Sequence, residues 1–140
     1  MKSIESKVRE SFGRQEFMGT IGAKMTFVGP GKMEIEIPFS PKLTQQNGFV
    51  HAGVITSILD SACGYAALSV APEEAEVLSV EFKVNLLAPA VGESFVARAG
   101  VKRAGKTLIV CAADAFAIKS GEEKVIATML ATIMSMSPKG

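Results

Sequence analysis

Apolar residues recur along the chain with two different periods. Between positions 54 and 69 they are three or four apart, which is the spacing of one helical face, at Ile55, Ile58, Leu59, Ala62 and Ala66. The other positions of this stretch are mostly small, and Asp60 is the one charged residue between Ala52 and Ser69. A surface helix would carry more charge on its outer side. We therefore expect a central helix that other structure encloses on nearly every side.

Elsewhere apolar and polar residues alternate with a period of two, which is typical of strands with one wet face. Before the helix, the pattern predicts strands at 23–28 and 32–39. After the helix it predicts four more, at 78–86, 93–103, 107–118 and 124–136. Ala104-Gly105 is a tight hairpin signal between two of them. Residues 1–18 predict a short amphipathic helix, with Ile4, Val8 and Phe12 on one side.

Two strands, one long helix and four antiparallel strands fit an α+β fold, a curved antiparallel sheet wrapped around one long central helix. A length of 140 residues suits a single domain over 1–140. Such a sheet covers the helix on one side only, so the side lined by small residues needs a lid. A second copy of the chain is the simplest lid, and the pattern therefore predicts a dimer.

Composition narrows the class of protein. Apolar residues make up 48% of the chain and charged residues 21%, which excludes disorder. A net charge of +1 without a basic run gives no indication of a nucleic-acid partner. We expect no membrane span and no signal peptide, which favours the cytoplasm. Cys63 and Cys111 are predicted to be reduced core residues rather than a disulfide or a metal site.

Asp60 is the first candidate for chemistry, because burying an unpaired carboxylate is costly. On a helical wheel it lies away from the apolar stripe. Its neighbours one turn away are small and leave room for a substrate or a water: Thr56, Ser57, Cys63 and Gly64. The carboxylate either acts on a substrate or is paired for structural reasons, and the pattern leaves both readings open.

The start of the predicted helix is the second candidate. Free N–H groups at a helix start carry partial positive charge and can hold a developing oxyanion. Ala52 and Gly53 are small enough to let a carbonyl oxygen approach them. His51, the only histidine, either acts as an acid–base group or orients the loop by hydrogen bonding. With no second His or Cys nearby, it does not indicate a metal site.

Three basic residues cluster around the predicted hairpin, at Lys102, Arg103 and Lys106. A basic hairpin tip either binds phosphate groups or is a solvated turn. The sequence pattern alone does not distinguish the two.

The segment GFVHAGVITSILDSACGYAA resembles the hotdog-fold acyl-CoA thioesterases of the phenylacetate-degradation (PaaI-like) family. In that family a loop with an amide side chain leads to a His-Gly-Gly helix start, and an acid follows nine residues after the His. Here these are His51-Ala52-Gly53 and Asp60. The segment LSVEFKVNLLAPAVGE is similar to the family's third strand, and KRAGKT to its basic turn. The resemblance implies a hotdog fold and hydrolysis of acyl-CoA thioesters to free acid and CoA, without cofactor or metal.

The resemblance also implies roles for particular residues. Asp60 would be the general base or nucleophile, and the Ala52 N–H would polarise the thioester carbonyl. Ser79 would supply a hydroxyl that helps to place the water. Arg103 and Lys106 would meet the CoA phosphates.

The sequence leaves open which amide side chain lies beside the helix start. The family has Asn six residues before the His, where this chain has Gln45, and a separate amide is present at Asn47. Both remain candidates. Further substrate contacts are expected from the same motifs, at Gly53, Phe49, Pro89 and Thr107. The acyl pocket is expected near Phe49, Tyr65 and the N-terminal segment.

Ala52 and Asp60 are eight residues apart, roughly 12 Å along one helix axis at 1.5 Å per residue. One thioester carbon cannot lie beside both. The helix start of one chain and Asp60 of another can converge if two helices pack antiparallel across a two-fold axis. We therefore predict a site shared between the subunits of a homodimer, and a homotetramer built as a dimer of dimers remains open.

Two other functions stay under consideration. A hotdog hydratase or dehydratase would need a His–acid pair on one substrate carbon, and His51 and Asp60 are the candidates. A non-catalytic acyl-CoA-binding module would use the same fold without turnover. The presence of Asp60 argues against this second alternative, because a pure binder gains nothing from the acid.

Overall fold

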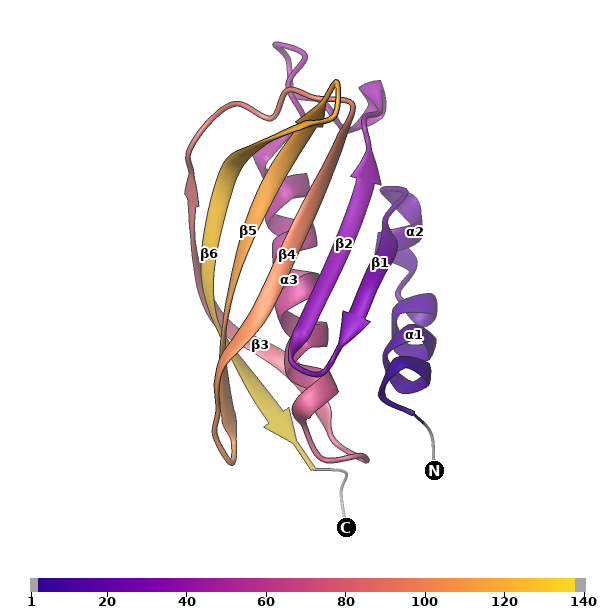
Figure 1. Cartoon of the computed structure of the whole chain (residues 1–140), viewed down its shortest axis with the longest axis vertical. Coiled ribbons are helices and arrows are strands. Elements are labelled where there is room, and N and C mark those ends of the chain that lie inside the picture. The colour runs from indigo at the N-terminus through magenta and orange to yellow at the C-terminus, as the bar shows by residue number, and fades with distance from the viewer. Residues whose placement is uncertain (1–2, 138–140) are drawn as a thin grey trace.

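One antiparallel sheet curves around one long helix in the computed structural model of the chain, which describes residues 3–137 (Figure 1). The six strands lie in the order β1-β2-β4-β5-β6-β3. Their bounds are β1 Lys24–Gly29, β2 Lys32–Pro38, β3 Glu76–Leu86, β4 Ser94–Ala104, β5 Leu108–Lys119 and β6 Glu122–Met136. The helices are α1 Ile4–Arg14, α2 Glu16–Thr20, the short 3-10 turn η1 Pro41–Leu43 and the central α3 Ala52–Val70.

The predicted apolar stripe of α3 forms the centre of the core. Its members Ile55, Ile58 and Leu59 are buried against the concave face of the sheet. Full burial of such a side chain contributes about 1.5–3 kcal/mol. The facing strands carry alanine at several inward positions, which lets the helix approach the sheet closely: Ala97, Ala113, Ala115, Ala127 and Ala131.

By length and hydropathy alone, α3 would be long enough to cross a membrane, contrary to the expectation from the sequence. More than half of its apolar stretch is buried inside the fold. The sheet supplies the apolar surroundings that this helix requires, so its composition is that of a core helix.

The predicted N-terminal helix over 1–18 is in fact two helices. Residues 1 and 2 lie outside the described part of the chain, α1 ends at Arg14, and α2 begins at Glu16. Gln15 interrupts the helix because its backbone is extended, with φ −85° and ψ 100°. The amphipathic pattern is correct for α1, whose Val8 is fully buried and whose Phe12 packs on the core.

A β-bulge changes the face that β3 presents. The sequence alternates from Leu78 to Leu86 without interruption, which predicts one apolar face. The register of β3 against β6 shifts between Ser79 and Glu81, so Val80 is the extra residue. Ser79 therefore faces the helix together with the apolar residues that follow the bulge, such as Phe82. Periodicity could not show this reversal, because the extra residue is itself apolar.

The side of α3 away from the sheet is open in the single chain, as expected for a helix that the sheet covers on one side only. Thr56, Ser57 and Asp60 remain partly exposed in the single chain. Beside them runs β3, which forms one edge of the sheet. Its apolar side chains are among the most exposed in the described residues, at 58% for Leu78 and 55% for Leu86. The edge of β3 and the small-residue side of α3 thus form one surface that a single chain leaves open.

The basic hairpin between β4 and β5 forms as predicted, with a turn at residues 105–107. The Gly105 N–H donates to the Leu108 carbonyl over 2.9 Å. A Cβ at Gly105 would lie 2.6 Å from that carbonyl oxygen, so only glycine fits this tight turn. Figure 1 shows the hairpin at the end of the sheet opposite the loop that precedes α3.

Candidate active site

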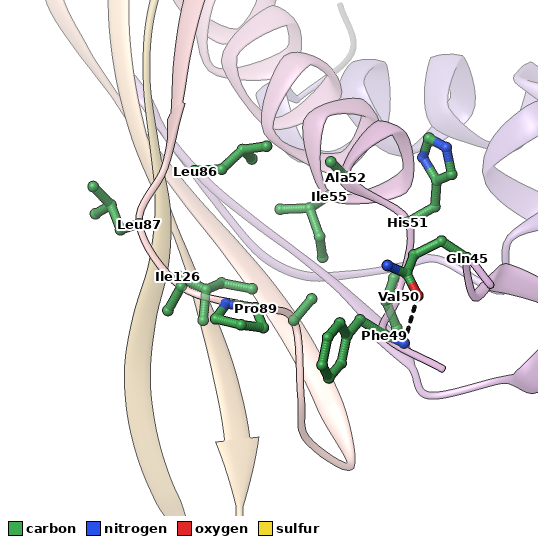
Figure 2. Close-up of a pocket in the computed structure, with 12 residues that line it drawn as sticks. Gln45, Phe49, Val50, His51, Ala52, Ile55, Leu86, Leu87, Pro89 and Ile126 are labelled. Atoms are coloured by element: carbon green, nitrogen blue, oxygen red, sulfur yellow. Dashed lines mark hydrogen bonds between the residues drawn. The ribbon is translucent and has the colours of Figure 1, made fainter. Parts of the chain in front are cut away.

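Two cavities lie along α3, and each holds part of the predicted site. The first, of about 530 Å³, surrounds the start of the helix, and Figure 2 shows its lining. Ala52 and Ile55 come from α3, and Gln45 and Phe49 from the preceding loop. The other wall comes from the end of β3 and the segment after it, including Pro89. This first cavity is mostly apolar.

The Ala52 N–H is the backbone donor that the helix start leaves open. His51 is the N-cap of α3, and its Nδ1 accepts the Gly53 N–H over 2.8 Å. The His51 carbonyl accepts from Val54 and more weakly from Ile55. Within residues 3–137, no acceptor contacts the Ala52 N–H. Gly53 does not line the cavity and its N–H is already used, so of the two predicted oxyanion donors only Ala52 fits.

Gln45 supplies the amide side chain of this cavity. Its Oε1 accepts from the Asn47 N–H over 2.5 Å and from the Phe49 N–H over 3.2 Å, which closes the loop. In Figure 2 its amide nitrogen points away from these bonds. Asn47 is exposed and does not line the cavity. Of the two amides proposed from the sequence, the structure brings only Gln45 to the helix start.

Asp60 lies in the second cavity, of about 470 Å³, between α3, α1 and the start of β3. The Ser79 hydroxyl donates to Asp60 Oδ1 over 2.6 Å. The β3 bulge turns Ser79 towards α3 and so creates this contact. None of the residues lining this cavity is basic, so within the described chain the carboxylate has a hydroxyl partner and no cation. The structural pairing considered for Asp60 is therefore a hydrogen bond to one carboxylate oxygen, and the residue lines an open cavity.

The cysteines do not add a nucleophile to the site. Both are buried and unbridged, as predicted. Burial raises the pKa of the Cys63 thiol far above its ordinary value and that of Cys111 to about 11. Both therefore stay protonated near neutral pH. Among the described residues, no three His, Cys, Asp or Glu side chains are grouped so as to hold a metal ion.

The basic hairpin lies at the same end of the fold as Asp60. Arg103, Lys106 and Thr107 are all exposed. The Thr107 carbonyl accepts the Ser135 N–H over 2.7 Å, and Ser135 pairs with Val77 at the start of β3. The first cavity lies instead at the other end of β3, near Leu86.

In a single chain the predicted residues thus lie in two separate groups. Gln45, Ala52, Phe49 and Pro89 line one cavity, with His51. Asp60 and Ser79 line the other, at the same end as the hairpin. Four polar residues of the second cavity were not expected from the sequence: Ser11, Gln15, Ser61 and Glu76. Ser11 lies on α1 and Gln15 directly follows it, four residues later. Their position beside the apolar stripe of the predicted helix was the one feature of the sequence that could have indicated them.

Comparison with known proteins defines the family. A model of the thioesterase superfamily matches residues 47–124, and the chain belongs to this superfamily. Its structure superposes on a thioesterase family protein from Silicibacter pomeroyi with a TM-score of 0.96 and 52% identity, covering 97% of this chain and 100% of that one. Over 110 residues it is 32% identical to a Saccharolobus solfataricus protein named as an inferred esterase, covering 79% of this chain and 76% of the relative.

The E. coli PaaI protein from the phenylacetic acid degradation operon shares the fold, with a TM-score of 0.84 over 98% of this chain and 94% of that one. At 16% identity this likeness concerns the fold alone. The predicted hotdog fold is confirmed, and the predicted resemblance to PaaI-like thioesterases is supported. Superfamily membership and the esterase-named relatives indicate a hydrolase of acyl thioesters.

Proposed function

We propose that this protein hydrolyses acyl-CoA thioesters to the free acid and CoA, at sites shared between the two chains of a homodimer. The observation that carries the proposal is Asp60, a carboxylate that faces an open cavity with a hydroxyl partner and no basic neighbour. A structural acid would be paired with a cation or buried against backbone donors. In a chain of the thioesterase superfamily, an open carboxylate of this kind fits a catalytic role.

Asp60 can act in either of two ways. As a general base it takes a proton from water, whose oxygen attacks the thioester carbon while the C–S bond breaks. The proton then passes to the departing CoA thiolate. As a nucleophile its free oxygen attacks the carbon directly, and the C–S bond breaks so that CoA thiolate leaves a mixed anhydride. Water then cleaves the anhydride to the free acid and the regenerated carboxylate, and the proton that is released passes to the thiolate. In both routes the Ser79 hydroxyl holds one carboxylate oxygen, so that the other is directed at the substrate.

The thioester oxygen would be held at the helix start of the partner chain. An N–H without an acceptor, at the positive end of a helix, stabilises charge that develops on a carbonyl oxygen. The Ala52 N–H meets this description, and the Gln45 amide lines the same cavity. The first cavity, which Phe49 and Pro89 help to line, would then bind the thioester oxygen and the pantetheine arm of the substrate.

The open edge of β3 supports the dimer. An unpaired edge strand with exposed apolar side chains is a template for pairing with another chain. Pairing of two β3 strands across a two-fold axis would extend the sheet and place the two α3 helices antiparallel. Asp60 of one chain would then approach Ala52 of the other. Whether two such dimers associate further into a tetramer stays a prediction, as does the cytoplasmic location.

The same symmetry would bring the hairpin to the helix start of the partner. Arg103 and Lys106 lie at the Asp60 end of their own chain. Across the two-fold axis, that end faces the first cavity of the partner. The exposed guanidinium and ammonium groups would there meet the phosphates of a bound CoA.

No observation favours the dehydratase or the binding-module alternatives. The His51 Nδ1 is used in capping α3, and His51 does not line the cavity of Asp60. The test is to incubate the protein with saturated and 2,3-unsaturated acyl-CoAs and to follow free thiol and hydration of the double bond separately. Thiol release from saturated acyl-CoA supports hydrolysis. Hydration without thiol release, or tight binding without any turnover, would overturn it.

A further inference from the structure

Four hydrogen-bonded polar side chains form one wall of the Asp60 cavity. The Tyr65 hydroxyl lies 3.2 Å from Ser11 Oγ and 3.1 Å from Gln15 Nε2. The Ser61 hydroxyl donates to Gln15 Oε1 over 3.3 Å. We call these four residues the Tyr65 cluster. All of them line the same cavity as Asp60 and Ser79.

The Tyr65 cluster contains hydrogen-bond donors that no described residue accepts from. Ser11 and Tyr65 share one hydrogen bond between two hydroxyls, so one O–H remains free whichever of them donates. Gln15 uses one of the two hydrogens on Nε2, since the Tyr65 oxygen accepts one of them. No described residue takes up the remaining O–H or N–H. The wall therefore presents donors to whatever fills the cavity.

The position of these side chains is fixed by the fold. The Phe12 ring packs edge-on against the Tyr65 ring at 5.8 Å, and Val8 anchors α1 in the core. The extended backbone of Gln15 ends α1 and turns the amide towards α3. Tyr65 is only 7% exposed, so its hydroxyl cannot simply turn to solvent.

We infer that the Tyr65 cluster recognises the acyl group, and that the preferred thioesters carry an uncharged oxygen substituent, such as a hydroxyl or keto group, several bonds from the thioester carbon. This inference rests on the proposed thioester hydrolysis. Tyr65 is five residues after Asp60, about 7.5 Å further along the helix axis. An acyl group whose thioester carbon lies at Asp60 would reach the cluster with its far end.

The charges around the cavity select for a neutral group. Asp60 and Glu76 both line it, and none of its lining residues is basic. A second carboxylate on the acyl group would therefore be repelled and would find no cation. An unsubstituted alkyl chain would leave the cluster's donors without partners and would displace water from them, which is also unfavourable. A neutral oxygen acceptor satisfies both conditions.

Part of this wall lies outside the segment that defines the superfamily. Ser11 and Gln15 precede residues 47–124, which the superfamily model matches, while Ser61 and Tyr65 lie within them. The acyl preference is thus a property that the N-terminal helix adds to the common catalytic segment.

The test compares matched pairs of acyl-CoAs, each an unsubstituted chain and the same chain with a remote hydroxyl or keto group. For the unsubstituted protein, kcat/KM should be higher for the oxygenated member of a pair. Tyr65→Phe keeps the ring and its contact with Phe12 but removes the hydroxyl, and should reduce this preference about five- to tenfold, the value of one or two hydrogen bonds. Gln15→Met should reduce it similarly. Ser6→Ala, an exposed position on α1 outside the cavity, is the matched control.

The outcomes separate the two proposals. If the protein hydrolyses both members of every pair equally, and Tyr65→Phe changes both rates alike, the acyl inference is wrong and the hydrolase stands. If Tyr65→Phe is poorly folded, Gln15→Met and a Ser11→Ala variant decide by the same ratio of rates. If no acyl-CoA releases thiol, the proposed function itself fails and the acyl inference fails with it.

Discussion

The two cavities along α3 differ in what they can do to a thioester. The cavity at the helix start is mostly apolar and offers a backbone N–H at Ala52 and an amide at Gln45. The cavity around Asp60 is polar and offers a carboxylate and hydroxyls. One can polarise a carbonyl, and the other can deliver a base or a nucleophile. One rigid helix separates Ala52 from Asp60 by roughly 12 Å, and the shared-site proposal therefore requires that the two cavities combine across a dimer.

Removing the carboxylate should have the largest effect. Asp60→Ala should lower kcat by about two to four orders of magnitude, the range expected for loss of a base or nucleophile. Asp114→Ala removes an exposed carboxylate from β5 and is the matched control, with kcat expected to stay unchanged. Initial rates of thiol release at saturating acyl-CoA measure both. A near-parental rate for the Asp60 variant would show that the polar cavity is not where the chemistry occurs.

Mixing two damaged chains tests whether the cavities combine across a dimer. Ala52→Pro deletes the open N–H at the first position of α3, where proline is tolerated. The preceding His51 already has the extended backbone that a following proline requires, with φ −59° and ψ 136°. Each homodimer should be nearly inactive. In a mixed dimer with Asp60→Ala, one site in two is intact, so activity should recover to about half that of the parent.

The mixing experiment needs two controls. Differently tagged chains must be shown to exchange, and circular dichroism must show that the Ala52→Pro chain is folded. If verified heterodimers are as inactive as their parents, both groups act within one chain and the shared site is wrong.

The hairpin should affect binding rather than chemistry. Changing Arg103 and Lys106 to Ala should raise KM for acyl-CoA about 10- to 100-fold, because hydrogen bonds to charged groups such as phosphate are worth about 1.5–3 kcal/mol. The kcat value should change little, since those contacts are made equally before and in the transition state. A thioester that lacks the nucleotide should be hydrolysed equally by parent and variant. Equal losses on both substrates would indicate that the hairpin acts through folding.

Loss of the Ser79 hydroxyl should have the smallest effect of the four. Ser79→Ala removes the 2.6 Å hydrogen bond to Asp60, and kcat should fall about three- to tenfold, which corresponds to the net value of about 1 kcal/mol for one intramolecular hydrogen bond. Thr132→Ala, which removes a hydroxyl that contacts Glu81 on the neighbouring strand, is the matched control. Full activity of the Ser79 variant would mean that Asp60 needs no orienting partner.

The sequence determined much of the fold and named the candidate residues of the proposed site. The helix at 52–70 and the strands around it follow from local periodicity, which depends only on which side chains face the core. Gly105 in the hairpin, the small residues at the helix start and the single acid of α3 were equally visible. Their spacing along one helix sufficed to predict that one chain does not complete the site.

The tertiary structure decided which side chains meet. The bulge at Val80 turns Ser79 towards Asp60, and no period shows it, because the extra residue is as apolar as its neighbours. The break at Gln15 was also not visible in the sequence, because almost any residue type can adopt the extended backbone that separates the two helices. The choice of Gln45 over Asn47 depends on which amide the loop turns into the cavity. Such contacts join residues far apart in the chain, where local patterns carry no information.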